Sequence, residues 1–175
     1  MSRDDIIIAT KVGGNFYEGT PVLDFSPHYV RFAAEQSLRR LQRNQIDLYQ
    51  LHNPNLRQIA EGSIFDSLED LREEGKIRFI GVSVASPEEG MAAIATGRVD
   101  AVQIPLNLFH QSPARDLIPL AEEKGIALIA REPLANGFLT GKYTQDSLFE
   151  EGDIRNQWPR AAIHRRVEAV EAMRI

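Results

Sequence analysis

The chain has 175 residues, a net charge of −5 at pH 7 and no cysteine. This length suits a single domain with a sizeable core, the negative charge argues against nucleic-acid binding, and the lack of cysteine excludes disulfides and thiol-ligated metals. No apolar run approaches the ~20 residues that span a bilayer, and the first residues, MSRDD, are acidic where a signal peptide is basic, so we expect a cytoplasmic protein without membrane or nucleic-acid partners.

Five short apolar runs predict β-strands. In chain order they are 5–11 (DIIIATK), 46–52 (IDLYQLH), 78–83 (RFIGVS), 100–107 (DAVQIPLN) and 126–132 (IALIARE). Their apolar residues are nearly continuous rather than alternating, which is typical of strands buried on both faces of a parallel sheet.

The segments between these runs have helical spacing. Each of three segments places its apolar residues on one face: Val30, Ala34, Leu38 and Leu41; Ile64, Leu68 and Leu71; Leu117, Leu120 and Ala121. Ser-Pro pairs at Ser26, Ser86 and Ser112 predict helix starts, with a capping box between Ser86 and Glu89. Gly75, Gly97 and Gly125 are placed to end helices in a left-handed conformation. Strand and helix therefore alternate, which predicts a parallel α/β sheet.

Two architectures fit this alternation, an open doubly wound sheet and a (β/α)8 barrel. The segment KVGGNF after the first strand lacks the G-x-G-x-x-G spacing of a dinucleotide-binding open sheet. Polar residues end every strand: Lys11, His52, Ser83, Gln103 with Asn107, and Arg131 with Glu132. Barrel enzymes take their active-site residues from these carboxyl ends, so the pattern favours a barrel; the plainer explanation is that strands simply end in polar loops.

Several segments together resemble the aldo-keto reductases. IIIATKVG is similar to the family's third strand, IDLYQLHNP to the fourth, EGKIRFIGVS to the fifth, AVQIPLN to the sixth and PLANGFLTGKY to the loop after the seventh. These segments follow the family's order and extend over about residues 3 to 160. The resemblance implies an incomplete (β/α)8 TIM barrel, in which residues 1–175 form a single partial domain with strands three to seven and their helices.

A complete barrel needs roughly 250 residues, more than this chain has. The chain is then a fragment, or an arc that closes against another chain, or natively incomplete. An unclosed arc exposes two strand edges, so self-association through those edges is expected.

The resemblance gives two residues a catalytic role. Lys11 would lower the pKa of an acid tyrosine, and His52 would donate a hydrogen bond to the substrate carbonyl oxygen. Without the resemblance, Lys11 would be interpreted as an exposed strand-end lysine and His52 as a structural histidine. Lysine is a rare metal ligand and no second histidine lies at a strand end, so no metal site is expected.

The resemblance also implies an NADP(H) site. Ser83 and Gln103 would hold the nicotinamide carboxamide, although Val84 stands where the family commonly has asparagine, and Arg131 would take the place of a stacked aromatic ring. The turn that embraces the phosphates, with the residues flanking it, would comprise Glu132, Pro133, Leu134, Ala135, Asn136, Gly137, Lys142 and Arg155. Segment 131–160 otherwise reads as a long surface loop, and Trp158 as a substrate wall or a packing anchor.

Three functions remain open at this point. The first is hydride transfer between NADPH and a small aldehyde or ketone, impaired in this chain because the family's catalytic aspartate and tyrosine precede the lysine strand. The second is a non-catalytic nicotinamide-nucleotide-binding or interaction module on the same scaffold. The third is a different barrel enzyme that uses Lys11 to form a Schiff base.

Overall fold

The computed structural model describes residues 6–17, 19 and 22–173. Its main sheet has five parallel strands in the spatial order β1-β4-β5-β6-β7. The strands are β1 (Ala9–Val12), β4 (Ile46–His52), β5 (Ile77–Ser83), β6 (Ala101–Pro105) and β7 (Ala127–Arg131). Two short strands, β2 (Gly14–Asn15) and β3 (Val22–Leu23), form a separate antiparallel pair. All five predicted strands are present, with β4 at the predicted bounds; the start of the first prediction, Asp5, lies outside the described residues.

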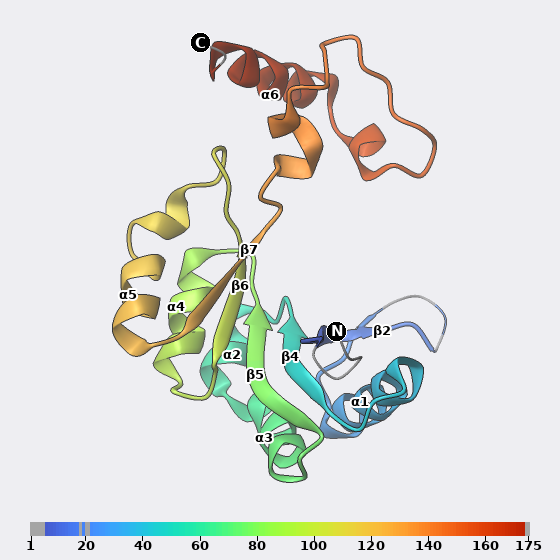
Figure 1. Cartoon of the computed structure of the whole chain (residues 1–175), viewed down its shortest axis with the longest axis vertical. Coiled ribbons are helices and arrows are strands. Elements are labelled where there is room, and N and C mark those ends of the chain that lie inside the picture. Colours follow the sequence, from blue (N-terminus) through green and yellow to red (C-terminus); the bar gives the residue numbers. More distant parts are fainter. Residues whose placement is uncertain (1–5, 18, 20–21, 174–175) are drawn as a thin grey trace.

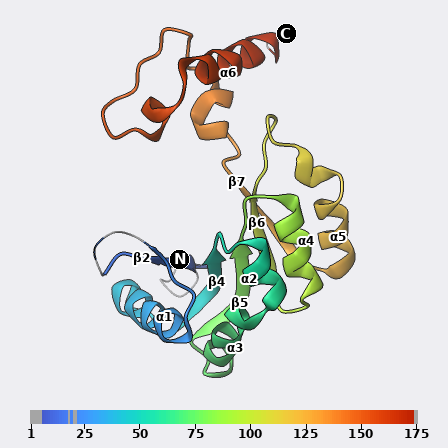
Figure 2. The ribbon, with the colours of Figure 1, turned by 180° about the vertical axis from the view of Figure 1, so that it is seen from behind.

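Helices connect the strands. They are α1 (Pro27–Leu41), α2 (Leu56–Glu61), α3 (Asp66–Glu73), α4 (Pro87–Ala95), α5 (Leu117–Lys124) and α6 (Arg160–Met173), with 3-10 turns η2 (Ser63–Phe65), η3 (Ser112–Ala114), η4 (Ala135–Thr140) and η5 (Ile154–Gln157). In Figure 1 the strands lie in front of α2, α3 and α4, and in Figure 2, seen from behind, these helices lie in front. The helices therefore cover one face of the sheet, and its other face is open.

Most of the predicted helix ends are confirmed. Ser26 Oγ accepts from the Tyr29 amide, and Ser86 and Glu89 form the capping box. Gly75, Gly97 and Gly125 have positive φ, as expected at the ends of α3, α4 and α5. The prediction at Ser112 is wrong: its side chain caps no helix, because Ser112–Ala114 forms a 3-10 turn and α5 begins only at Leu117.

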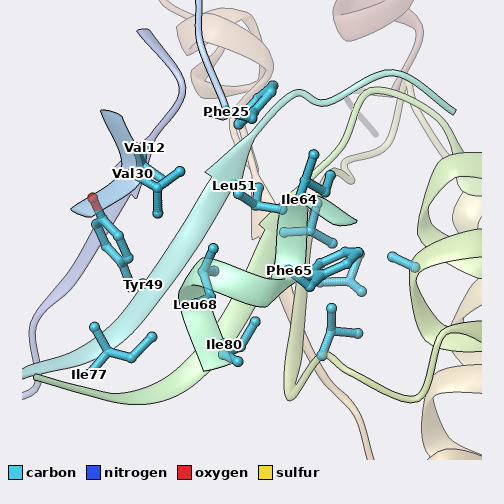
Figure 3. Close-up of a cluster of buried hydrophobic side chains, with 14 of the residues drawn as sticks. Val12, Phe25, Val30, Tyr49, Leu51, Ile64, Phe65, Leu68, Ile77 and Ile80 are labelled. Atoms are coloured by element: carbon cyan, nitrogen blue, oxygen red, sulfur yellow. The ribbon is translucent and has the colours of Figure 1, made fainter. Parts of the chain in front are cut away.

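The main core lies between the sheet and its helices. Figure 3 shows Tyr49, Leu51 and Ile80 of the strands against Phe65 and Leu68 of the helix layer. These five side chains are fully buried, and the burial of the four purely apolar ones, at about 1.5–3 kcal/mol each, holds the helix layer on the sheet. Because strand residues alternate between faces, the residues between them point to the open face.

The prediction that all five strands are buried on both faces is wrong. Phe79 of β5 is 43% exposed, and Ala127 of β7 is exposed on the same open face. The five strands form an open arc, so residues on the concave face lack the opposing strands that a closed barrel would supply. At the amino-terminal end of that face lies an apolar trough of about 520 Å³, lined by residues that include Leu48, Phe79 and Ile129.

A second, smaller cluster lies in the C-terminal part. Phe138 stacks on Trp158 with ring centroids 5.9 Å apart, and both pack with Ile163 and Val167 of α6. Figures 1 and 2 show η4 to α6 as a lobe beyond the end of the sheet. Phe109, from the loop after β6, joins this cluster and ties the lobe to the sheet layer.

Candidate active site

The register of the sheet gathers four of the predicted residues on its concave face. His52 pairs with Ser83, and Ser83 pairs in turn with Gln103. Lys11 pairs with Gln50, which lies two residues before His52 and so points to the same face. The strand-end residues Lys11, His52, Ser83 and Gln103 thus share one face at the carboxyl ends of four adjacent strands.

Arg131 reaches this group from the edge strand. It pairs with Pro105, two residues beyond Gln103, and therefore starts on the same concave face. Its Nη1 donates to Ser83 Oγ at 3.2 Å and to Asn53 Oδ1 at 3.3 Å. The Arg131 side chain consequently crosses β6 and reaches the ends of β5 and β4.

Sequence reasoning missed Asn53 and Gln50. Asn53 has a φ of 54° and donates its amide to the Ser83 carbonyl at 2.8 Å, which turns its side chain toward Arg131. Asparagine tolerates positive φ better than most residues, so its place directly after the strand was a usable signal. Gln50 is 1% exposed, and its Oε1 accepts no hydrogen bond from the described residues. Strand alternation alone would have placed it on the same face as His52.

Two cationic side chains, Lys11 and Arg131, interact electrostatically with the His52 imidazole in this cluster. Burial lowers the pKa of His52, and the positive charges of Lys11 and Arg131 lower it further. Burial and the charge of Arg131 likewise lower the pKa of Lys11. No carboxylate contributes to either shift, so the described part of the site is electropositive. Lys11 and His52 lie on the same face of two adjacent strands, near each other in the register.

Ser83 and Gln103 lie beneath the Arg131 side chain. Ser83 is fully buried, and Gln103 Oε1 is a buried acceptor that has no hydrogen-bond partner among the described residues. Arg131 Nε is also buried without a hydrogen bond, although Glu132 Oε1 lies 3.8 Å away. The cluster therefore holds polar atoms that its own residues leave unpaired.

The predicted phosphate turn has an unusual backbone. Glu132, Ala135, Asn136 and Gly137 all have φ between 48° and 90°. Asn136 Nδ2 donates to Glu132 Oε2 at 2.9 Å, and the Ala135 amide donates to the Glu132 carbonyl at 2.8 Å. Pro133 and Leu134 are exposed at the tip. The turn is thus held by its own hydrogen bonds.

Arg155 joins this turn, but Lys142 makes a different contact. Arg155 Nη1 donates to the Asn136 carbonyl at 3.0 Å, while its Nε donates to Asp153 at 2.9 Å. Arg155 holds the pKa of Asp153 down at about 2, so the two form an ion pair. Lys142 Nζ lies 4.8 Å from the ring centroid of Tyr143.

Trp158 serves as a packing anchor, as its stacking on Phe138 shows.

The predicted site residues form two groups, the strand-end cluster and the turn cluster, which meet at Arg131 and Glu132. The Asn107 side chain helps to fix that junction by donating to the Glu132 carbonyl at 2.9 Å.

Neither a metal-binding cluster nor a membrane-spanning helix is found in the described residues. Among residues 6–17, 19 and 22–173, no group of three or more His, Asp or Glu side chains is placed to hold a metal ion. No helix within those same ranges is long and apolar enough to cross a membrane.

The chain is similar to known oxidoreductases. It is 35% identical over 142 residues to an uncharacterized oxidoreductase, YqkF, of Bacillus subtilis (strain 168), covering 80% of this chain and 46% of the relative. It is 35% identical over 159 residues to the aldo-keto reductase YhdN of the same organism, covering 90% and 47%. A probable aldo-keto reductase 1 of Glycine max is 38% identical over 144 residues, covering 81% and 41%.

Solved structures give the same result. The glycerol dehydrogenase AKR11B4 from Gluconobacter oxydans superposes with a TM-score of 0.76 at 32% identity, covering 95% of this chain and 53% of that one. The holo form of aldo-keto reductase AKR11C1 from Bacillus halodurans gives 0.70 at 32% identity, covering 86% and 49%. The chain thus spans about half the length of these relatives. The sequence model of the aldo/keto reductase family matches residues 1–174. This chain, a five-stranded part of a TIM barrel, belongs to the aldo/keto reductase family.

Proposed function

We propose that the chain supplies part of the active site of an NADP(H)-dependent reductase, which transfers hydride between the cofactor and the carbonyl of a small aldehyde or ketone. The observation that carries this proposal is the position of Lys11, His52, Ser83 and Gln103 on one face of the sheet, at the carboxyl ends of four adjacent strands. Family membership supports oxidoreductase chemistry, and a holo form is known for the Bacillus halodurans relative.

The strand-end residues fit the nicotinamide carboxamide. Gln103 Oε1 is a buried acceptor that no described residue bonds, and a primary carboxamide offers the N–H that such an acceptor lacks. The Ser83 hydroxyl, next to it in the register, can bond the carboxamide oxygen. When bound, NADPH would supply the hydride, and the protein residues would orient the reacting carbon.

His52 would act on the substrate oxygen. Its lowered pKa favours neutral imidazole near neutral pH, and one ring nitrogen then carries a hydrogen to donate. Negative charge grows on the carbonyl oxygen as hydride arrives, so a donor aimed there stabilises the transition state. The Lys11 ammonium adds positive charge to the same region. No tyrosine contributes to the pKa shift of Lys11 or His52, so we assign the proton donor to none of the described residues.

Residues 132–137, with Lys142 and Arg155, would hold the phosphates. The contact of Arg155 with the Asn136 carbonyl supports a shared role, because it places a guanidinium against the turn. Asp153 already pairs with that guanidinium, so Arg155 would bind phosphate only as part of a network that includes this carboxylate.

A second function has one specific observation in its favour. No acidic group contributes to the electrostatics of Lys11 or His52 in the described chain, so binding without turnover is consistent with the site. The second proposal is therefore a nicotinamide-nucleotide-binding module.

Composition supports a further proposal, a cytoplasmic location.

Titration with NADPH tests the binding step common to both functions. We expect NADPH to quench the fluorescence of Trp158, and Gln103→Leu to weaken binding about tenfold, the usual effect of losing one hydrogen bond to a buried group. Gln45→Leu is the matched control, because Gln45 lies at the opposite end of β4 and bonds the Gly75 carbonyl. Equal affinity for the two variants would count against the proposed carboxamide site.

A further inference from the structure

Arg131 covers the two residues that the proposed function assigns to the carboxamide. Its side chain starts on β7, and its Nη1 reaches Ser83 on β5. Gln103 lies on β6, between these strands, and is the register partner of Ser83. The arginine therefore passes over Gln103, and in this arrangement both the Ser83 side chain and Gln103 Oε1 are shielded from solvent.

The covered arrangement is poorly satisfied. The two hydrogen bonds of Nη1 are 3.2 and 3.3 Å long, beyond the usual 2.9–3.0 Å of N–H···O bonds. Gln103 Oε1 and Arg131 Nε stay buried without a hydrogen bond to any residue that the structure describes. An unmade hydrogen bond at a buried polar atom is costly, so moving the guanidinium into water would relieve two such atoms while breaking two long bonds. The closed position is consequently easy to leave.

From this geometry we infer that Arg131 controls access to the Ser83–Gln103 pair. The guanidinium must leave Ser83 and Asn53 before a primary carboxamide can bond to the strand ends. The covered and open forms compete, and ligand affinity falls in proportion to the fraction of chains in the open form. This inference rests on the proposed function, since it concerns access to the same cofactor site.

Asn53 is the anchor that can be removed without touching the proposed carboxamide contacts. Its Oδ1 accepts from Arg131, whereas Ser83 would serve both the arginine and the ligand. Removal of the Asn53 amide weakens the covered form alone. Substitution of Asn53 or Arg131 should therefore strengthen ligand binding, whereas substitution of Ser83 or Gln103 should weaken it.

The test measures association by stopped-flow fluorescence with two probes. NADPH contains the nicotinamide, and adenosine 2′,5′-bisphosphate lacks it. We expect Arg131→Ala to bind NADPH more tightly, by up to about tenfold and chiefly through faster association, since tenfold is the factor by which a covered form populated at 90% reduces affinity. Asn53→Ala should change NADPH binding in the same direction by a smaller factor. Neither variant should change the affinity for adenosine 2′,5′-bisphosphate.

The remaining outcomes distinguish failure of this inference from failure of the proposed function on which it rests. Weaker or unchanged NADPH binding by both variants would overturn access control and leave the cofactor site in place. NADPH binding by Arg131→Ala but not by the unchanged chain would support access control. Absence of NADPH binding in the unchanged chain and in both variants would overturn the proposed function, and the inference with it. Arg57→Met is the control for arginine loss, because Arg57 pairs with Glu61 on the surface of α2.

Discussion

His52 and Ser83 lie directly opposite each other across the parallel pairing of β4 and β5. A proposed catalytic group and a proposed cofactor ligand are thus fixed by the backbone ladder rather than by a loop. Sites on regular elements are held more tightly than sites on loops. The chemistry proposed for these two residues can therefore be tested by substitutions that leave the sheet intact.

The titration of His52 is the most direct test of the electropositive cluster. We expect its pKa to lie below the usual 6.5, because burial and the charges of Lys11 and Arg131 disfavour the imidazolium. Lys11→Met should raise this pKa, whereas Lys124→Met, whose ammonium pairs with Glu123 on α5, should leave it unchanged. Histidine ring chemical shifts followed by NMR against pH give both values. An unshifted His52 in the Lys11→Met chain would show that the two groups are not close.

The same shift gives stability a pH dependence. Below about pH 6.5 the unfolded chain takes up the proton of His52 before the folded chain does, because the folded pKa is lower. The free energy of unfolding should therefore fall as pH drops from 6.5 through the folded pKa of His52. Urea unfolding of the unchanged chain and of His52→Asn, at pH 7 and pH 5, measures this contribution as a smaller loss in the variant.

Turnover by this chain alone is expected to be undetectable. No tyrosine or carboxylate among the described residues shifts the pKa of Lys11 or His52, and a carbonyl oxygen must receive a proton when hydride arrives. NADPH consumption with simple aldehydes, followed by absorbance, should match the rate without protein. Robust turnover that is lost in His52→Ala would show that a proton donor is present after all.

Gly81 tests how tightly the concave face is packed. A Cβ at this position would lie 2.8 Å from Gln50 Cγ, 3.1 Å from Leu48 Cδ1 and 3.3 Å from the Ala101 carbonyl oxygen. Gly81→Ala should therefore cost about 1–3 kcal/mol of unfolding free energy, the usual cost of overpacking. Ala130→Ser, at an exposed position of β7, is the control and should change stability little. A neutral Gly81→Ala would mean that the Gln50 side chain moves freely.

Self-association should depend on the concave face. The trough at its amino-terminal end exposes Phe79, and the outer edges of β1 and β7 are not paired with other described strands. We expect dimers or larger species in sedimentation velocity at high concentration, with Phe79→Glu shifted toward monomer. Leu148→Glu changes an equally apolar and more exposed residue far from the trough, and should have no effect. A monomer at all concentrations would contradict this expectation.

The sequence was informative for most features that a local rule governs. The continuous apolar runs located the strands, and the serine caps at Ser26 and Ser86 are confirmed. The helix start predicted at Ser112 is wrong because Ser112–Ala114 forms a 3-10 turn. Such short turns share the N-terminal preferences of helices. The exposure of β7 could not be predicted, because an apolar strand sequence does not reveal which neighbours are present to cover it.

Contacts between distant residues were also out of reach of the sequence. The bond of Arg131 to Ser83 joins residues 48 positions apart and follows from the path of a long side chain across β6. That Gln103 Oε1 has no partner within the described part of the chain likewise becomes known only from its surroundings. The roles of Lys11, His52 and the 132–137 turn remain predictions.

Successive side chains of β5 point to opposite faces of the sheet, and this has an evolutionary consequence. Val82 packs in the core and Ser83 lies in the site, one residue apart on opposite faces. An insertion or deletion of one codon within this strand would exchange the two faces, burying a hydroxyl among hydrocarbons and turning a valine into the pocket. Lineages carrying this strand are therefore constrained to vary by substitution, and changes in chain length are confined to the loops on either side.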